Sequence, residues 1–121
     1  MALRNKPSTI SLRLAVVEAV GLNEAYVLAR IEAMTEFRPV IHDNGRAWIS
    51  MPLKAIAADL LPLGKVTAYK CISSLVGAGI LDSCRGASLG LRVGHGHLQM
   101  HYSIDMEQLQ VLEDAYAFSP V

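Results

Sequence analysis

The chain has 121 residues, of which 52% are hydrophobic and 18% charged, a composition typical of a globular protein rather than a disordered one. No apolar run approaches the ~20 residues that span a bilayer. The apolar stretch near the N-terminus is interrupted by Arg13 and Glu18, which argues against a secretory signal or a membrane anchor. We therefore expect one cytoplasmic domain over residues 1–121 that does not associate with membranes.

The formal net charge is zero, because eleven basic residues balance eleven acidic ones. The charges are nevertheless distributed unevenly along the chain. Residues 44–101 hold six Lys and Arg against two Asp, whereas residues 105–114 hold four acids and no base. A local positive excess is the electrostatic footprint that a nucleic-acid-binding surface requires. Chance clustering on a solvated surface is the alternative interpretation.

The first part of the chain predicts helical structure and a turn. We expect a short extended piece at Ile10–Leu12, then a helical turn or more that ends at Gly21. Asn23 is expected to cap a helix over residues 23–37, where apolar residues recur at helical spacing. Asp43-Asn44-Gly45 predicts a turn because Asn and Gly accept positive φ, so a small β-hairpin or an approach strand should surround it. We expect Trp48 to lie in the core.

A pair of helices with a tight break is predicted next. Ser50 and Pro52 suit the start of a helix whose apolar positions include Leu53, Ile56 and Leu60. Pro62 and Gly64 interrupt it. A second helix over Lys65–Val76 should bury Ala68, Ile72, Leu75 and Val76, and should end at Gly77 or Gly79.

Two strands, Ile80–Arg85 and Gln99–Ile104, are then expected around a Gly-rich loop. Asp105 should cap a final amphipathic helix. This order predicts a helix-rich α+β fold, the winged helix-turn-helix, with a two-stranded wing and flanking N- and C-terminal helices. The helix-turn-helix covers about residues 52–79, the wing about 80–104 and the C-terminal helix about 105–117.

Four segments in this order carry a family resemblance: GLNEAYVLARIEAM, GRAWISMPLKAIAADLLP, KVTAYKCISSLVGAGIL and HYSIDMEQL. Over residues 20–110 the chain resembles winged-helix proteins of phages and other mobile elements, namely replication-initiator-like and replisome-organiser-like domains. The resemblance implies binding of duplex DNA in replication initiation or transcriptional regulation. At Thr67-Ala68-Tyr69-Lys70 the chain has one cation fewer than the recognition helix of that family.

The candidate DNA-binding residues follow from the predicted helix-turn-helix and wing. The N-terminal half of the second helix enters the major groove in helix-turn-helix proteins, and cations on a wing contact phosphates or the minor groove. The candidates are Lys54, Lys65, Thr67, Tyr69, Lys70, Arg85 and Arg92. The alternatives are that the lysines are merely solvated and that Tyr69 packs on a neighbouring element.

No metal, cofactor or catalytic site is expected. His95, His97, His101 and Cys84 are metal-ligand types, but their spacing matches no recognised zinc motif and no carboxylate lies between Gly86 and Ser103. We expect both cysteines to pack as reduced thiols. The chain has neither the phosphate-binding G-x-x-x-x-G-K-[ST] loop nor the G-x-S-x-G elbow, so an enzyme is not expected.

The expected partner is double-stranded DNA. Because few cations allow few phosphate contacts, useful affinity should need a homodimer on adjacent half-sites, formed through helix 23–37 or helix 105–117. The alternative function is a winged-helix interaction module that no longer reads DNA. Such a module would bind a phage or host protein, and would inhibit a host nucleic-acid enzyme or defence complex.

Overall fold

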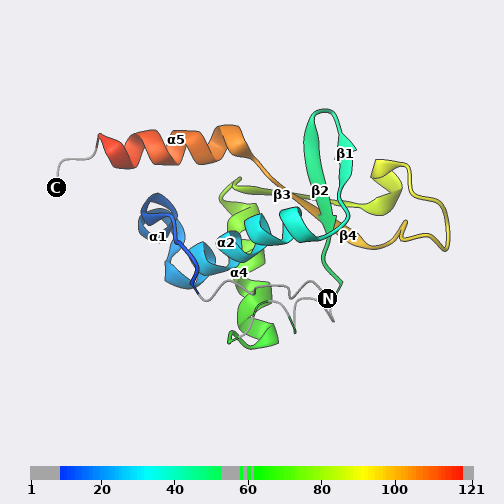
Figure 1. Ribbon diagram of the computed structural model, residues 1–121, viewed down its shortest axis with the longest axis horizontal. Coiled ribbons are helices and arrows are strands. Elements are labelled where there is room, and N and C mark those ends of the chain that lie inside the picture. Colours follow the sequence, from blue (N-terminus) through cyan, green and yellow to red (C-terminus); the bar gives the residue numbers. More distant parts are fainter. Residues whose placement is uncertain (1–8, 53–57, 59, 61, 119–121) are drawn as a thin grey trace, which may run out of the picture.

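The computed structural model describes residues 9–52, 58, 60 and 62–118 (Figure 1). The described part of the chain contains four α-helices and one four-stranded antiparallel sheet, which confirms the predicted helix-rich α+β class. The helices are α1 (Leu14–Val20), α2 (Leu22–Phe37), α4 (Lys65–Gly77) and α5 (Met106–Ala117). The strands are β1 (Ile41–Asp43), β2 (Arg46–Ser50), β3 (Leu81–Arg85) and β4 (Met100–Ile104), and a short 3-10 helix, η1 (Gly86–Leu89), follows β3.

The N-terminal helices begin differently from the prediction. Residues 9–13 have no regular secondary structure, and α1 and α2 are separated by Gly21 alone. Asn23 does not cap α2, because the helix already starts at Leu22 and the backbone N–H of Ala25 donates to the carbonyl of Gly21 at 3.1 Å. The expected cap at Asn23 is therefore wrong.

Helix α2 lies at the centre of the hydrophobic core. Its side chains at Val27, Leu28 and Ile31 are at most 1% exposed, and it packs against α1, α4 and β2. Among the described side chains of residues 23–37, the apolar ones are buried or half-buried in the fold of a single chain, whereas Leu22, just before them, is 61% exposed. Helix 23–37 therefore offers little described apolar surface to a second copy.

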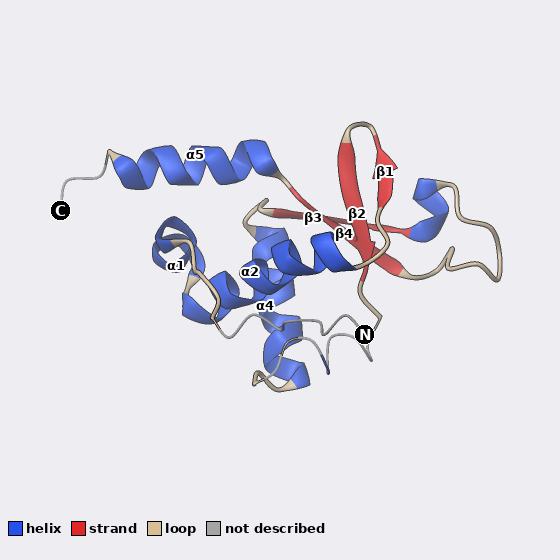
Figure 2. Cartoon of the chain, in the orientation of Figure 1, coloured by secondary structure: helices blue, strands red, loops and turns tan. Residues whose placement is uncertain are grey.

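The sheet has the strand order β1-β2-β4-β3, so β4 lies between strands that are far apart in the sequence. The β1–β2 hairpin turns at Asn44 and Gly45, whose φ values are 51° and 74°, as the sequence predicted. Ile49 pairs with Tyr102 and Leu81 pairs with Ile104, and this face of the sheet contributes Ile49, Leu81 and Tyr102 to the core. Figure 2 shows the sheet together with α5 and the β3–β4 loop, which extend in opposite directions.

The other face of the sheet is polar. Arg46 lies over the ring of Trp48, 5.3 Å from its centroid, and forms an ion pair with Asp82 on β3. The Arg46–Asp82 ion pair spans β4, which lies between β2 and β3 in the sheet. Ser103 of β4 is only 3% exposed. Trp48 is half-buried under a cation instead of lying in the core as expected.

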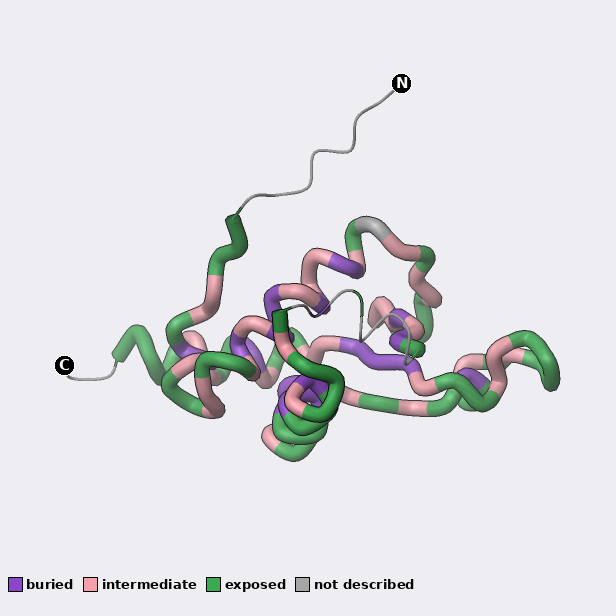
Figure 3. Tube along the Cα trace, turned by 90° about the horizontal axis from the view of Figure 1, so that it is seen from below, coloured by how far each residue is buried: buried purple, intermediate pink, exposed green. Residues whose placement is uncertain are grey.

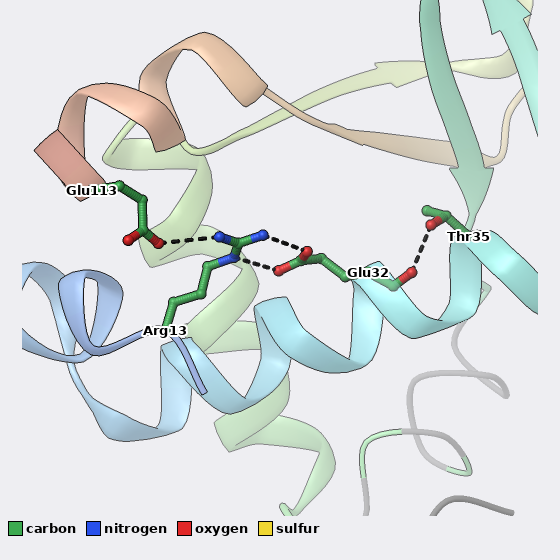
Figure 4. Close-up of polar contacts among 4 residues, drawn as sticks. All are labelled: Arg13, Glu32, Thr35 and Glu113. Carbon is green, nitrogen blue, oxygen red and sulfur yellow. Dashed lines mark hydrogen bonds and ion pairs between the residues drawn. The ribbon is translucent and has the colours of Figure 1, made fainter. Parts of the chain in front are cut away.

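Helix α5 completes the fold. The carboxylate of Asp105 accepts a hydrogen bond from the backbone N–H of Gln108 at 3.0 Å, so the predicted cap is confirmed. Leu109 is 1% exposed, and Glu113 meets Arg13, which also binds Glu32 on α2 (Figure 4). None of the helices described is long and apolar enough to cross a membrane.

Figure 3 shows that the buried positions gather in the middle of the molecule. Exposed positions dominate the far end of α5 and the tip of the β3–β4 loop, which lie at opposite ends of the same view. Among the described residues, the candidate site residues lie on two elements, α4 and the region formed by β3 and its following loop.

Candidate nucleic-acid interface

Helix α4 has one buried stripe and one outward stripe. Ala68, Cys71, Ile72 and Leu75 recur at three- and four-residue spacing and are each at most 3% exposed. The sequence predicted three of these four; Val76, also predicted, is only half-buried. The buried stripe packs on α2 and β3, so the opposite side of α4 faces solvent.

The outward stripe contains both lysines of the predicted recognition helix. Lys65 and Lys70 are exposed, Tyr69 is 37% exposed, and Ser73 and Ser74 continue the exposed surface toward the C-terminus. Thr67 is only half-buried, which places it at the edge of this stripe rather than on the open surface as expected. Of the four candidates on α4, the two lysines are therefore the best placed for a contact.

The N-terminal half of α4 carries positive charge that nothing on the helix offsets. No acidic residue occurs in its sequence, and no side chain caps its N-terminus. Within the described part of the chain, no carboxylate forms an ion pair with Lys65 or Lys70. The partial positive charge of a helix N-terminus adds to the two ammonium groups. This half of α4 is suited to an anionic partner.

Tyr69 is close enough to Tyr102 of β4 to act on it electrostatically. Burial is the main cause that raises the pKa of Tyr102, and the nearby Tyr69 raises it further. The side chain of Tyr69 is itself 37% exposed, so part of its ring is available to a ligand.

The loop between β3 and β4 is closed at its base by backbone hydrogen bonds. Gly86 donates to the carbonyl of Gln99 at 2.9 Å, and Ala87 donates to that of His97 at 2.8 Å. A Cβ atom on Gly86 would lie 2.1 Å from the carbonyl oxygen of Gly96, so only glycine permits this close approach. The loop is therefore a folded structure rather than an open strand connection.

The tip of this loop is also hydrogen-bonded. The N–H of His95 donates to the carbonyl of Arg92 at 2.9 Å, and the N–H of Gly94 donates to Nδ1 of His97 at 3.3 Å. Arg92 is exposed beside Val93, whose side chain is 82% exposed. Arg92 is thus presented at the end of a defined turn.

Two candidates remain, Arg85, whose guanidinium makes a hydrogen bond within the protein, and Lys54. Arg85, at the end of β3, donates from Nη1 to the carbonyl of Leu98 at 3.3 Å and so braces the loop. Lys54 lies outside the described residues. Arg85 has other N–H groups to offer a ligand, but its guanidinium is less free to move than that of Arg92.

The histidines and cysteines are distributed over different surroundings. His95 is exposed on the loop, while His101 is 3% exposed on β4, where it pairs with Cys84 of β3. Among the described residues, no cluster of three or more His, Cys, Asp or Glu is arranged to hold a metal ion. Burial raises the pKa of both thiols, so Cys71 and Cys84 favour the protonated, unreactive form.

Sequence reasoning missed Val66, the second residue of α4, whose side chain is 69% exposed. Val66 lies on the side of α4 opposite the buried stripe. Lys70 lies on this same side, one turn closer to the C-terminus. The helical period alone places Val66 on this side, but an apolar side chain is not an obvious sign of a DNA contact.

Comparisons with family models, curated proteins and solved structures found no match.

Proposed function

We propose that the chain is a winged-helix protein of a phage or other mobile element that binds duplex DNA in replication initiation or transcriptional regulation. The chain order α4, β3, loop 86–99 and β4 supports a recognition helix followed by a wing. The pairing of β2 with β4 supports a strand that joins the wing hairpin in one sheet. The first helix of the helix-turn-helix, predicted from Pro52 onward, lies largely outside the described residues.

The observation that carries this proposal is the exposed, acid-free N-terminal half of α4. Residues in this part of a recognition helix contact base edges in the major groove. Lys70 would contact a phosphate or a base edge, and Lys65 a phosphate. Backbone N–H groups at a helix N-terminus also favour phosphate, so they would assist the lysines. The lysines meet no carboxylate among the described residues that would have to be displaced first.

The β3–β4 loop is the proposed wing. Arg92 at its tip would contact a phosphate or enter the minor groove, where arginine is favoured by the negative potential. The hydrogen bonds at His95 and Gly94 order the turn before DNA arrives. Less conformational entropy is then lost on binding. Arg85 would act mainly by holding the base of the loop.

One copy should bind weakly, because few cations give few phosphate contacts. Two copies on adjacent half-sites would raise the affinity without any new kind of contact. Because the described apolar side chains of residues 23–37 are largely buried, α5 is the proposed surface for a homodimer. Its outward side chains include Met106 and Val111, each 59% exposed, and Phe118 beyond its end is 86% exposed.

The test is binding to random-sequence duplex DNA at low salt, followed by fluorescence anisotropy. We expect a Kd of about 1–100 μM near physiological salt, which tightens as salt is lowered. The double variant Lys65→Ala/Lys70→Ala should abolish most of the binding, whereas Glu107→Gln on α5 should not weaken it. Absence of binding by the wild-type chain at low salt would overturn the proposal.

The exposed apolar side chains of α5 and the zero net charge favour a second candidate function, the protein-interaction module. In this case α5 would dock on a phage protein or on a host nucleic-acid enzyme or defence complex. The two candidates differ in one measurement. A chain that leaves DNA unretarded at low salt, but captures one host protein stoichiometrically in a way that Phe118→Ser abolishes, supports the second.

A further inference from the structure

The outward face of α4 has an apolar side chain at its centre. Val66 is 69% exposed, although it lies between Lys65 and Lys70, which suit a negatively charged ligand. With 3.6 residues per turn, Val66 projects opposite Ala68, Cys71, Ile72 and Leu75, the buried stripe. On the same outward side lie Lys70 and Ser73, both exposed. Val66 is therefore the side chain of the first turn that meets whatever covers this face.

The chemistry of the major groove offers one apolar group to such a side chain. Adenine, guanine and cytosine present hydrogen-bonding groups there, whereas thymine presents a C5-methyl group beside its O4 acceptor. Valine has no donor or acceptor, so it gains nothing from the polar edges. It gains from removing a methyl group from water, which is worth about fourfold in affinity per buried methyl.

We propose that Val66 makes this protein select duplex DNA that carries a pyrimidine C5-methyl group in the major groove, which in ordinary DNA is thymine. This inference rests on the proposed DNA-binding function and adds the kind of site that α4 prefers. Lys65 and Lys70, on either side of Val66, hold the helix to the phosphates, and Val66 reads the methyl group. The lysines supply affinity and the valine supplies discrimination.

The surroundings of Val66 support this arrangement. No acidic side chain occurs on α4 to repel the nucleic acid. Ser73, on the outward stripe two turns further along, is short and leaves the helix free to sink toward the bases. A short apolar side chain such as that of Val66 reaches a base edge only when the helix backbone lies close to the groove floor. The small apolar side chain therefore fits a close approach to base edges.

The experiment compares duplexes that differ only in the methyl group. The full chain is titrated with alternating dA-dT and dA-dU duplexes, and with alternating dG-dC duplexes with and without 5-methylcytosine. We expect the methylated member of each pair to bind about fourfold more tightly. In Val66→Ser the two members of each pair should bind equally. Serine and valine have similar helix propensities and the site is exposed, so the fold should be kept.

Val93→Ser is the matched control, because Val93 is a similarly exposed valine on the β3–β4 loop and not on α4. It should leave the methyl preference unchanged. Equal binding of both members by the wild-type chain would overturn the inference and leave DNA binding intact. A preference that survives in Val66→Ser would overturn the role of Val66. Failure to bind any of the four duplexes would instead overturn the proposed function, and the inference with it.

Discussion

The guanidinium of Arg13 binds the carboxylate of Glu32 through two hydrogen bonds, from Nε at 2.8 Å and from Nη2 at 2.9 Å (Figure 4). Its Nη1 donates to Glu113 at 3.1 Å. The three residues come from the segment before α1, from α2 and from α5. One side chain therefore joins three parts of the chain, and this bidentate pairing is geometry that lysine cannot reproduce.

Arg13→Lys should reduce the free energy of unfolding by about 1 kcal/mol, and Arg13→Ala by about 1–2 kcal/mol. These values are modest because each partner is about one-third exposed. Glu32→Gln should cost more than Glu113→Gln, since Glu32 accepts two of the three hydrogen bonds. Urea unfolding measures all four variants. Equal stability of wild type and Arg13→Lys would show that the bidentate geometry contributes nothing.

Leu109 is the buried side chain of α5, which also contacts the rest of the fold through the half-buried Leu112 and the ion pair of Glu113. Leu109 is 1% exposed, whereas Val111 on the same helix is 59% exposed. Leu109→Ala should destabilise the protein by about 2–5 kcal/mol, because it removes buried methyl groups and leaves a cavity. Val111→Ala should change stability by less than about 0.5 kcal/mol. Similar unfolding midpoints for the two variants would contradict this account of how α5 packs.

The raised pKa of Cys71 should make the free energy of unfolding decrease at alkaline pH. Burial, with Glu24 beside the thiol, raises the pKa of Cys71 above its ordinary value of 9.0. Below pH 9.0 the thiol is protonated in both states. Above it the unfolded chain loses a proton that the folded chain retains, so stability falls as pH rises toward the raised pKa.

Unfolding at a series of pH values measures this slope. Cys71→Ala should lower stability at neutral pH and make the alkaline decline shallower. The decline should not vanish, because the pKa values of Cys84 and Tyr102 are raised as well. Thiol labelling gives an independent check, since the partly exposed Cys84 should react before Cys71, which is 2% exposed. Rapid labelling of both thiols in the native state would refute the buried placement of Cys71.

The salt dependence of DNA binding distinguishes the proposed phosphate contacts from one another. Each contact contributes about −0.9 to the slope of log Kobs against log salt. Lys70→Ala and Arg92→Ala should each flatten the slope by about 1, and Arg85→Ala by less, because Arg85 also braces Leu98. Glu107→Gln changes the net charge by one on α5, outside the proposed contacts, and should leave the slope unaltered. An unchanged slope in both Lys70→Ala and Arg92→Ala would remove these residues from the interface.

Sequence patterns correctly predicted the features that a few adjacent residues decide. The Asn44-Gly45 turn and the Asp105 cap were predicted correctly because the chemistry of a few adjacent residues decides them. The buried stripe of α4 followed from its period. By contrast, Gly21 and not Asn23 is the residue before the first turn of α2, because the end of α1 one residue earlier fixes where the next helix can begin.

The amino-acid order alone determined the class of fold, the succession of most of the described helices and strands, and the positions of the two lysines on α4. Only the tertiary structure decided which surfaces remain open. It covers α2 with α1, α4 and β2, and it brings Arg13 to Glu32 and Glu113. The reason is that burial depends on contacts between residues distant along the chain, whereas periodicity and capping depend only on neighbours.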